Sequence, residues 1–223
     1  MKHFHPPTPQ STLRRRLTTS LVVLTGACLA MLPQVLYAYD SLSSPIPIDL
    51  RVEAGHRPFL RGHAVGTQNY MCLPCPSPFP SPSPCPSDFV WVLVGPQATL
   101  FNDYETQIIT HFLSPNPDEV NIPPRATWQD SRDTSAVWAM AIKTYSKPDF
   151  VKPGAIPWLL LEVVGAEPDL DEGGRLTETK YIQRVNTAGG LAPTSGCDEA
   201  NVGKRVFEPY TADYIFYKAT RRE

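Results

Sequence analysis

Long helical periods and clustered positive charge are both missing from this chain. No segment of about twelve or more residues keeps apolar side chains at the spacing of a packed helix, and 25 prolines stand against 13 glycines. These features exclude a helical bundle and a coiled coil. Only 19% of the residues are charged, and no run of five basic residues occurs. A nucleic-acid surface needs clustered Lys and Arg to neutralise phosphates, so we expect no nucleic-acid partner.

Motifs for cofactors, metals and activated serines are missing as well. The chain has no Gly-x-Gly-x-x-Gly turn for a nicotinamide cofactor and no Gly-x-Ser-x-Gly elbow for a nucleophilic serine. His56 and His63 are seven residues apart, which is not a recognised metal spacing. We therefore expect no cofactor and no metal, and the sequence favours a protein that is not an enzyme.

The first 38 residues have the pattern of a secretory signal peptide. They carry Lys2 and Arg14 to Arg16 but no acidic residue, and an apolar stretch follows from about Leu17 to Ala38. We place cleavage after Ala38 and predict export to the periplasm, the extracellular space or the cell surface. The alternative is an uncleaved anchor, which would be the only contact with a membrane. Without this segment, 16 basic and 22 acidic residues leave a net charge of −6.

Short apolar runs rich in β-branched and aromatic residues predict an all-β domain. After an extended N-terminal arm over residues 39–63, we expect a single β-rich domain over residues 64–223, folded as an antiparallel β-sandwich or partly closed barrel with little helix. An α+β domain with a helix near residues 198–203 is the alternative. The expected strands cover residues 64–72, 88–94, 98–101, 107–113, 135–145, 156–164, 176–187 and 210–218.

Four cysteines follow the signal segment. An even number in an exported chain favours two disulfides over free thiols, and four cysteines allow three pairings. We predict a bond between Cys75 and Cys85, which closes a proline-rich loop insertion at residues 73–87. We also predict a bond between Cys72 and Cys197, which ties an early strand to a late loop.

Several sequence blocks are shared with one known family. The longest runs from Ile182 to Pro193, Ile-Gln-Arg-Val-Asn-Thr-Ala-Gly-Gly-Leu-Ala-Pro, with Cys197 after it, and others are Gly66 to Cys72 and Tyr210 to Phe216. In these blocks the chain resembles domain of unknown function 3455, found in exported bacterial and fungal proteins. The resemblance extends from about Gly62 to the end of the chain. It implies export, a compact β-rich domain and the Cys72–Cys197 pairing, but no known activity.

Polar and aromatic side chains, most of them on the expected strands, are the candidate ligand contacts. The planar guanidinium of Arg184 suits a carboxylate or phosphate of a ligand, and the alternative is a structural salt bridge to Asp133 or Asp213. We expect a pocket lined by side chains from several strands, with His111 among them. The candidate ligand-binding residues are Gln68, Tyr70, Trp128, Arg184 and Asn186.

His111 is the candidate for chemistry. It lies within an expected strand, where it would act as a general base if an acid such as Asp133 came within hydrogen-bond reach in an open cleft. A buried histidine bonded to a backbone carbonyl is the alternative. The leading hypothesis is an exported, non-catalytic module that binds an unknown small molecule or an envelope component. The other is an extracellular hydrolase or isomerase that uses His111 with Asp133.

Overall fold

The computed structural model describes residues 45–76, 85–119, 121–169 and 173–220. The signal peptide predicted for residues 1–38 lies outside the described residues, as does the middle of the proline-rich loop, residues 77–84. In the part of the chain that is described, no helix is long and apolar enough to span a membrane.

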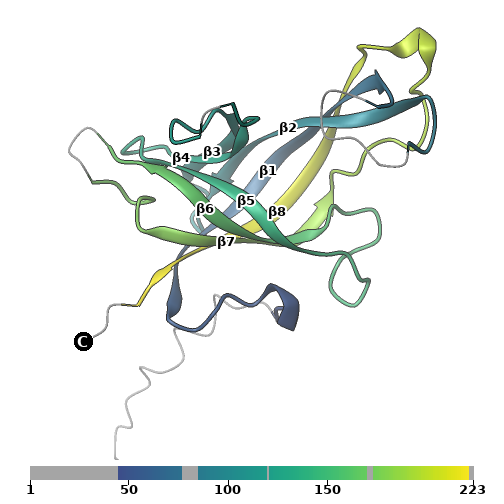
Figure 1. Cartoon of the computed structure of the whole chain (residues 1–223). Helices are drawn as coiled ribbons and strands as arrows, with labels where there is room; N and C mark the ends of the chain where they lie inside the picture. Colours follow the sequence, from purple (N-terminus) through teal and green to yellow (C-terminus); the bar gives the residue numbers. More distant parts are fainter. Residues whose placement is uncertain (1–44, 77–84, 120, 170–172, 221–223) are drawn as a thin grey trace, which may run out of the picture. The chain divides into compact units, whose positions relative to one another are not determined.

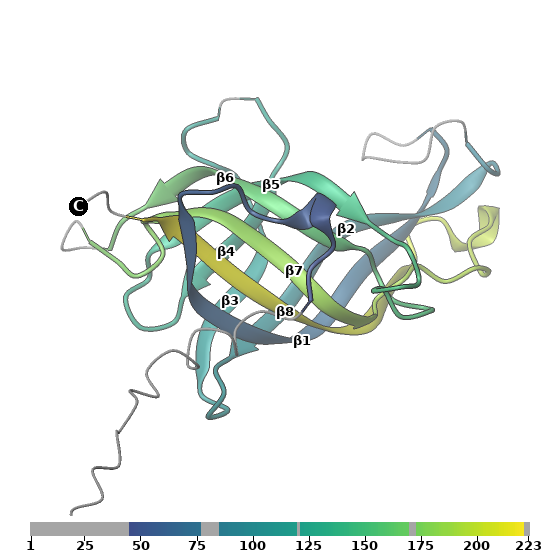
Figure 2. The same cartoon turned by 90° about the horizontal axis from the view of Figure 1, so that it is seen from below.

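Eight antiparallel strands form a closed barrel (Figure 1, Figure 2). Each strand pairs with the next along the chain and the last pairs back to the first, so the sheet has no free edge. The strands are β1 (His56–Pro74), β2 (Phe89–Phe101), β3 (Gln107–Ser114), β4 (Arg125–Asp130), β5 (Ala136–Tyr145), β6 (Trp158–Glu167), β7 (Thr179–Gly189) and β8 (Arg205–Ala219). The predicted all-β class is confirmed, and the expected sandwich or partly closed barrel is, more specifically, a closed barrel.

The first strand is longer than the sequence pattern indicates. β1 begins at His56, so residues 56–63 belong to the sheet and not to an extended arm, and they pair with the end of β8. Pro58, which has no N–H to donate, is accommodated because the register shifts between Pro58 and Leu60. At its other end β1 includes Pro74, which pairs with Phe89, so the loop insertion is shorter than expected.

Two other strands also differ from expectation. The runs 88–94 and 98–101 form one strand, β2, whose register with β1 shifts next to Gly95, where φ is 145°. β4 has no counterpart among the expected strands, because Arg125, Gln129 and Asp130 interrupt its apolar pattern. Near residues 198–203 there is only the 3-10 turn η4 (Glu199–Asn201), so the alternative of a helix there is wrong.

Alternate side chains point into the barrel and fill one end of it. The loop between β6 and β7 inserts the fully buried Leu176 into this core. Its neighbour Arg175 fastens the loop, because Nε donates to Oδ2 of Asp130 at 2.6 Å. Other fully buried side chains in this core are Leu100, Ile109, Val137, Ile182 and Phe216.

A second, smaller core lies on the outer wall of the barrel. It is formed where the N-terminal segment, with the 3-10 turn η3 (Ile48–Leu50), packs beside the strands (Figure 2). The backbone oxygen of Leu50 accepts a hydrogen bond from Nε2 of Gln183 at 2.6 Å, which fixes the segment. The described part of the expected arm is therefore packed against the barrel. The residues around Leu50 include Trp158, Leu160, Val185 and Ile215.

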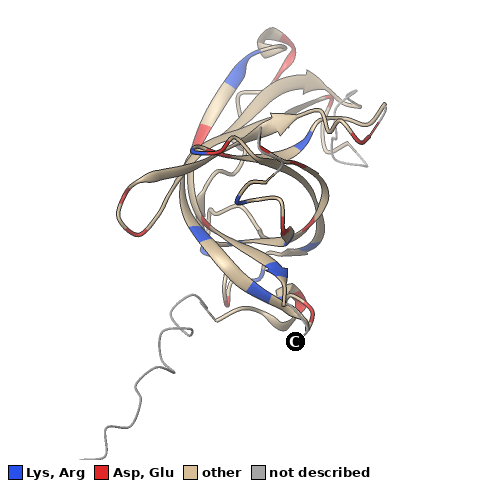
Figure 3. Ribbon diagram, turned by 90° about the vertical axis from the view of Figure 1, so that its left-hand side faces the viewer, with Lys and Arg blue, Asp and Glu red and all other residues tan. Residues whose placement is uncertain are grey.

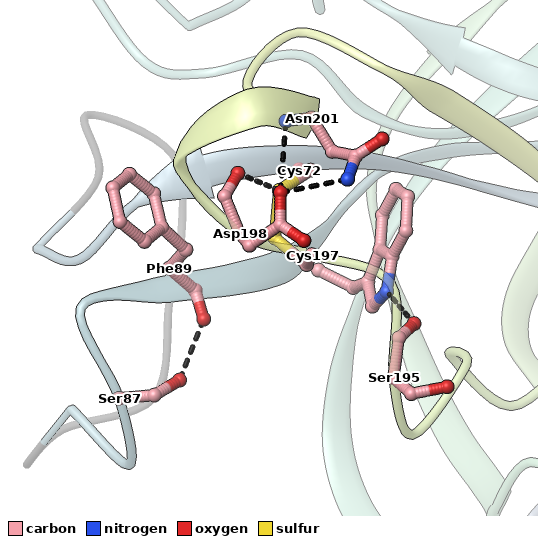
Figure 4. The surroundings of a disulfide bond; sticks show 8 residues. Cys72, Ser87, Phe89, Ser195, Cys197, Asp198 and Asn201 are labelled. Carbon is pink, nitrogen blue, oxygen red and sulfur yellow. Dashed lines mark hydrogen bonds between the residues drawn. A yellow bond between two sulfur atoms is a disulfide. The ribbon is translucent and has the colours of Figure 1, made fainter.

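Both predicted disulfides are present. The Cα atoms of Cys72 and Cys197 are 5.3 Å apart, and those of Cys75 and Cys85 are 5.9 Å apart. Figure 4 shows the first bond beside η4, whose N-terminus is capped by the side chain of Asp198. Disulfides are typical of proteins that fold in an oxidising, extracellular-type environment.

Removing the two disulfides separately is expected to destabilise the barrel unequally. The Cys72–Cys197 bond joins residues 125 apart in sequence, whereas the Cys75–Cys85 bond joins residues 10 apart. Restriction of the unfolded chain grows with loop length, so we expect losses of about 5 and about 3 kcal/mol respectively. Urea unfolding of the two double Cys→Ser variants, each the control for the other, measures this difference. Equal losses, or a larger loss for the short loop, contradict the prediction.

Candidate ligand-binding cavity

A cavity of about 190 Å³ lies inside the barrel, at the end away from Leu176. The two ends of β4 show this. Ala126, near the start of the strand, lines the cavity, whereas Asp130, at the end of the strand, is bonded to the loop that carries Leu176. All eight strands contribute to the lining, so the cavity belongs to the barrel interior. Its lining residues are Gln68, Leu93, Pro96, His111, Leu113, Ala126, Trp128, Ala139, Ala141, Leu159, Leu161, Arg184 and Tyr214.

Small side chains on two neighbouring strands leave the space for this cavity. Ala126 on β4 pairs with Ala139 on β5, and Ala141 lies two positions further along the lining face of β5. The interior of an eight-stranded barrel is just wide enough for side chains to fill it or for one small ligand. Alanines at these positions therefore keep one end of the interior open.

The rim of the cavity is apolar and its deeper wall carries polar groups. Leu93 and Leu113 at the rim are 44% and 37% exposed. Deeper in, Gln68 and His111 are each only 3% exposed, and Trp128 is buried beside them. A molecule that enters thus passes an apolar mouth before it meets polar side chains, which is the common arrangement of small-molecule sites.

Arg184 is the one cationic side chain of the lining. Its Nε and Nη2 donate to the backbone oxygen of Pro157 at 3.2 and 2.9 Å. The salt bridges considered as alternatives are not formed: Asp133 binds the turn after β4 and the loop before β7, and Asp213 binds His63. Among the described residues, no carboxylate forms an ion pair with Arg184. A guanidinium with no acid partner in a mostly apolar cavity is suited to an anion.

His111 is held rigidly and uncharged. Its Nδ1 donates to the backbone oxygen of Thr127 at 2.8 Å, and its ring stacks on Trp128 with centroids 4.2 Å apart and planes 10° apart. Burial lowers the pKa of His111 to about 3, and the charge of Arg184 acts in the same direction. No hydrogen bond joins it to Asp133, so the structure does not form the acid–base pair considered from the sequence. The ring is a fixed neutral group of the cavity wall.

Four of the expected pocket residues lie together, and two candidates lie elsewhere. Gln68, His111, Trp128 and Arg184 all line the cavity. Tyr70 is outside the lining, and its hydroxyl donates to the backbone oxygen of Gly190 at 2.7 Å.

Asn186 lies at an irregularity in the pairing of β7 with β8. It has a φ of 52° where the β7–β8 register shifts, and its Nδ2 donates to Oδ2 of Asp213 at 2.7 Å. A bulge residue in the left-handed region commonly re-aims the strand around it. Asn186 therefore shapes the strand that carries Arg184, two positions earlier.

Tyr214 is the cavity residue that the sequence reasoning missed. It is 1% exposed, lines the cavity from β8, and its ring lies edge-on to Trp128 at 5.5 Å. Its hydroxyl is 3.4 Å from the hydroxyl of Tyr210, and burial raises the pKa of Tyr210. The alternation of residues 212, 214 and 216 places Tyr214 on an inward face but does not reveal that a cavity lies there.

A second polar cluster lies on the outside of the barrel around His63. Its Nδ1 is 2.6 Å from Oδ1 of Asp213, and its Nε2 is 2.8 Å from Oδ1 of Asp103. These bonds raise the pKa of His63, with the bond to Asp103 as the largest cause, although partial burial opposes them. In the described chain, no group of three or more His, Cys, Asp and Glu side chains is arranged to hold a metal ion. The view in Figure 3 shows charges of both signs scattered along strands and loops.

Fold and cavity together define a closed eight-stranded antiparallel barrel with an internal cavity open at one end. The chain belongs to the family described as protein of unknown function (DUF3455), whose model matches residues 53–218. No curated protein and no solved structure is significantly similar to it. The family brings no activity, so the function has to follow from the chemistry of the cavity.

The His63 cluster gives a prediction about pH. Because the folded-state pKa is raised, the cluster stabilises the barrel fully below the unfolded value of about 6.5, and this contribution is lost as pH rises through the folded value. An NMR titration is expected to give His63 a pKa above 6.5, and Asp103→Asn should lower it. Glu105→Gln is the control, because Glu105 lines the same surface depression without bonding to His63. A His63 pKa that is unchanged by Asp103→Asn would show that the bond to Asp103 does not raise it.

Proposed function

We propose that this protein binds a small organic carboxylate inside the barrel. The observation that carries the proposal is Arg184, a cationic side chain that lines an otherwise mostly apolar cavity and has no carboxylate partner among the described residues. Leaving a partly buried charge without an opposite charge costs free energy, which a bound anion recovers.

The size of the cavity limits the ligand. A volume of about 190 Å³ is somewhat larger than the roughly 150 Å³ engineered cavity that takes up benzene. This favours a molecule of about ten non-hydrogen atoms, in which a ring or short chain contacts Ala139, Leu159 and Leu161 while its carboxylate meets Arg184. The apolar wall would contribute through buried surface, and Arg184 would select the charge.

We place this binding activity after export. The basic and apolar pattern of residues 1–38 and the two disulfides support folding in an oxidising compartment. An envelope component as partner stays an alternative prediction. The hydrolase or isomerase hypothesis has lost the acid–base pair on which it depended, because His111 and Asp133 have separate partners.

Arg184→Gln is expected to weaken benzoate binding roughly 10- to 100-fold, the range for loss of a charge-assisted hydrogen bond. Isothermal titration calorimetry with benzoate measures this. Lys180→Gln is the matched control, because it removes one positive charge from an exposed position on the same strand. Equal effects of the two variants would show that benzoate responds only to net charge and would refute the proposal.

Filling the cavity is a second test of the same proposal. Ala139→Leu places a larger side chain in the lining and is expected to abolish benzoate binding while the barrel stays folded. Met140→Leu, on the neighbouring exposed position of β5, should leave binding unchanged. Circular dichroism confirms the fold of both variants. Unaltered benzoate affinity in folded Ala139→Leu would place the ligand elsewhere.

A further inference from the structure

We infer that the preferred ligand is a hydroxy-carboxylic acid with its two groups at opposite ends, the hydroxyl donating a hydrogen bond to Nε2 of His111. The inference rests on the proposed function and goes further by naming the second polar group of the ligand. It depends on the tautomer of His111, on the polar groups that share the cavity, and on the placement of β3 relative to β7.

The tautomer of His111 follows from its bond to the backbone. A carbonyl oxygen can only accept, so Nδ1, which lies 2.8 Å from the oxygen of Thr127, must carry the proton. Burial keeps the ring neutral, and a neutral imidazole with a proton on Nδ1 has a lone pair on Nε2. Nε2 is therefore a fixed hydrogen-bond acceptor.

This acceptor has no donor in the described chain. The hydrogen bond to Thr127 is the only one that the His111 ring forms with described residues. Its face is covered by Trp128, and the ring of Tyr214 meets it edge-on at 5.2 Å. Because His111 lines the cavity, a ligand that supplies a donor to this free acceptor gains a hydrogen bond and therefore affinity. A carboxylate cannot do this, because it only accepts, and an ammonium group would be repelled by Arg184.

The two polar groups face the cavity from opposite walls. His111 lies on β3 and Arg184 on β7, which are four strands apart in a closed barrel of eight. A ligand that meets both must therefore carry its carboxylate at one end and its hydroxyl at the other. Within a volume of about 190 Å³, a single ring with para substituents meets this requirement.

The test compares benzoate, 2-, 3- and 4-hydroxybenzoate and 4-methoxybenzoate by calorimetry with the unaltered protein. We expect 4-hydroxybenzoate to bind at least tenfold more tightly than benzoate and 4-methoxybenzoate, which corresponds to about 1.4 kcal/mol for one hydrogen bond. The preference should be constant between about pH 5.5 and 8, because His111 stays neutral there.

The variant His111→Phe tests the hydrogen bond to Nε2 separately from the stacking of the ring on Trp128. Phenylalanine retains a flat ring beside Trp128 but has no acceptor, so the ratio of the affinities for 4-hydroxybenzoate and benzoate should fall to about one, whatever the affinity for benzoate itself. If this variant does not fold, the affinities of the unaltered protein for 4-hydroxybenzoate and 4-methoxybenzoate test the same hydrogen bond.

The outcomes distinguish the two proposals. Equal affinities for benzoate, 4-hydroxybenzoate and 4-methoxybenzoate overturn the inference and leave the proposed function standing. Tighter binding of 2-hydroxybenzoate than of 4-hydroxybenzoate would show that His111 and Arg184 do not meet the ligand from opposite walls of the cavity. Failure of every benzoate to bind overturns the proposed function itself.

Discussion

The pairing of β1 with β8 is the constraint on which the rest of the structure depends. It runs from His56 opposite Ala219 to Met71 opposite Arg205 and joins the two ends of the folded chain. Because this pairing closes the sheet, every inward side chain faces a common interior and no strand edge is left to aggregate. The Cys72–Cys197 bond lies at one end of it and limits how far the unfolded chain can separate these segments.

Closure creates one interior that serves two purposes. At one end, large side chains and the inserted Leu176 fill it, and the bond between Arg175 and Asp130 holds the covering loop in place. At the other end, alanines replace larger residues, and Arg184 enters without an acid partner among the described residues. A core built only for stability would fill this space with apolar side chains. The departure at one end of an otherwise regular barrel is the reason for proposing a binding site there.

Much of this could be predicted from the sequence because it depends on local pattern. Gln68, His111 and Arg184 lie on expected strands, where alternation indicates which side chains share a face, whereas Trp128 lies on β4, which the pattern does not reveal. Side-chain partners that depend on the pairing register of strands far apart in the sequence could not be predicted. Asp213 lies opposite His63 only because β8 pairs with β1, and this removes it as a partner of Arg184. The closure of the barrel and the volume left by its alanines depend on that same register.

The proposed function depends on Arg184 holding an anion inside the barrel. The most direct measurement is an NMR titration of the protein with benzoate, following the side-chain Nε–H signal of Arg184 and the methyl signals of Ala139 and Ala141. We expect these signals to shift together and to saturate with one binding constant. Shifts confined to the outer surface around His63, with the Arg184 signal unmoved, would contradict it.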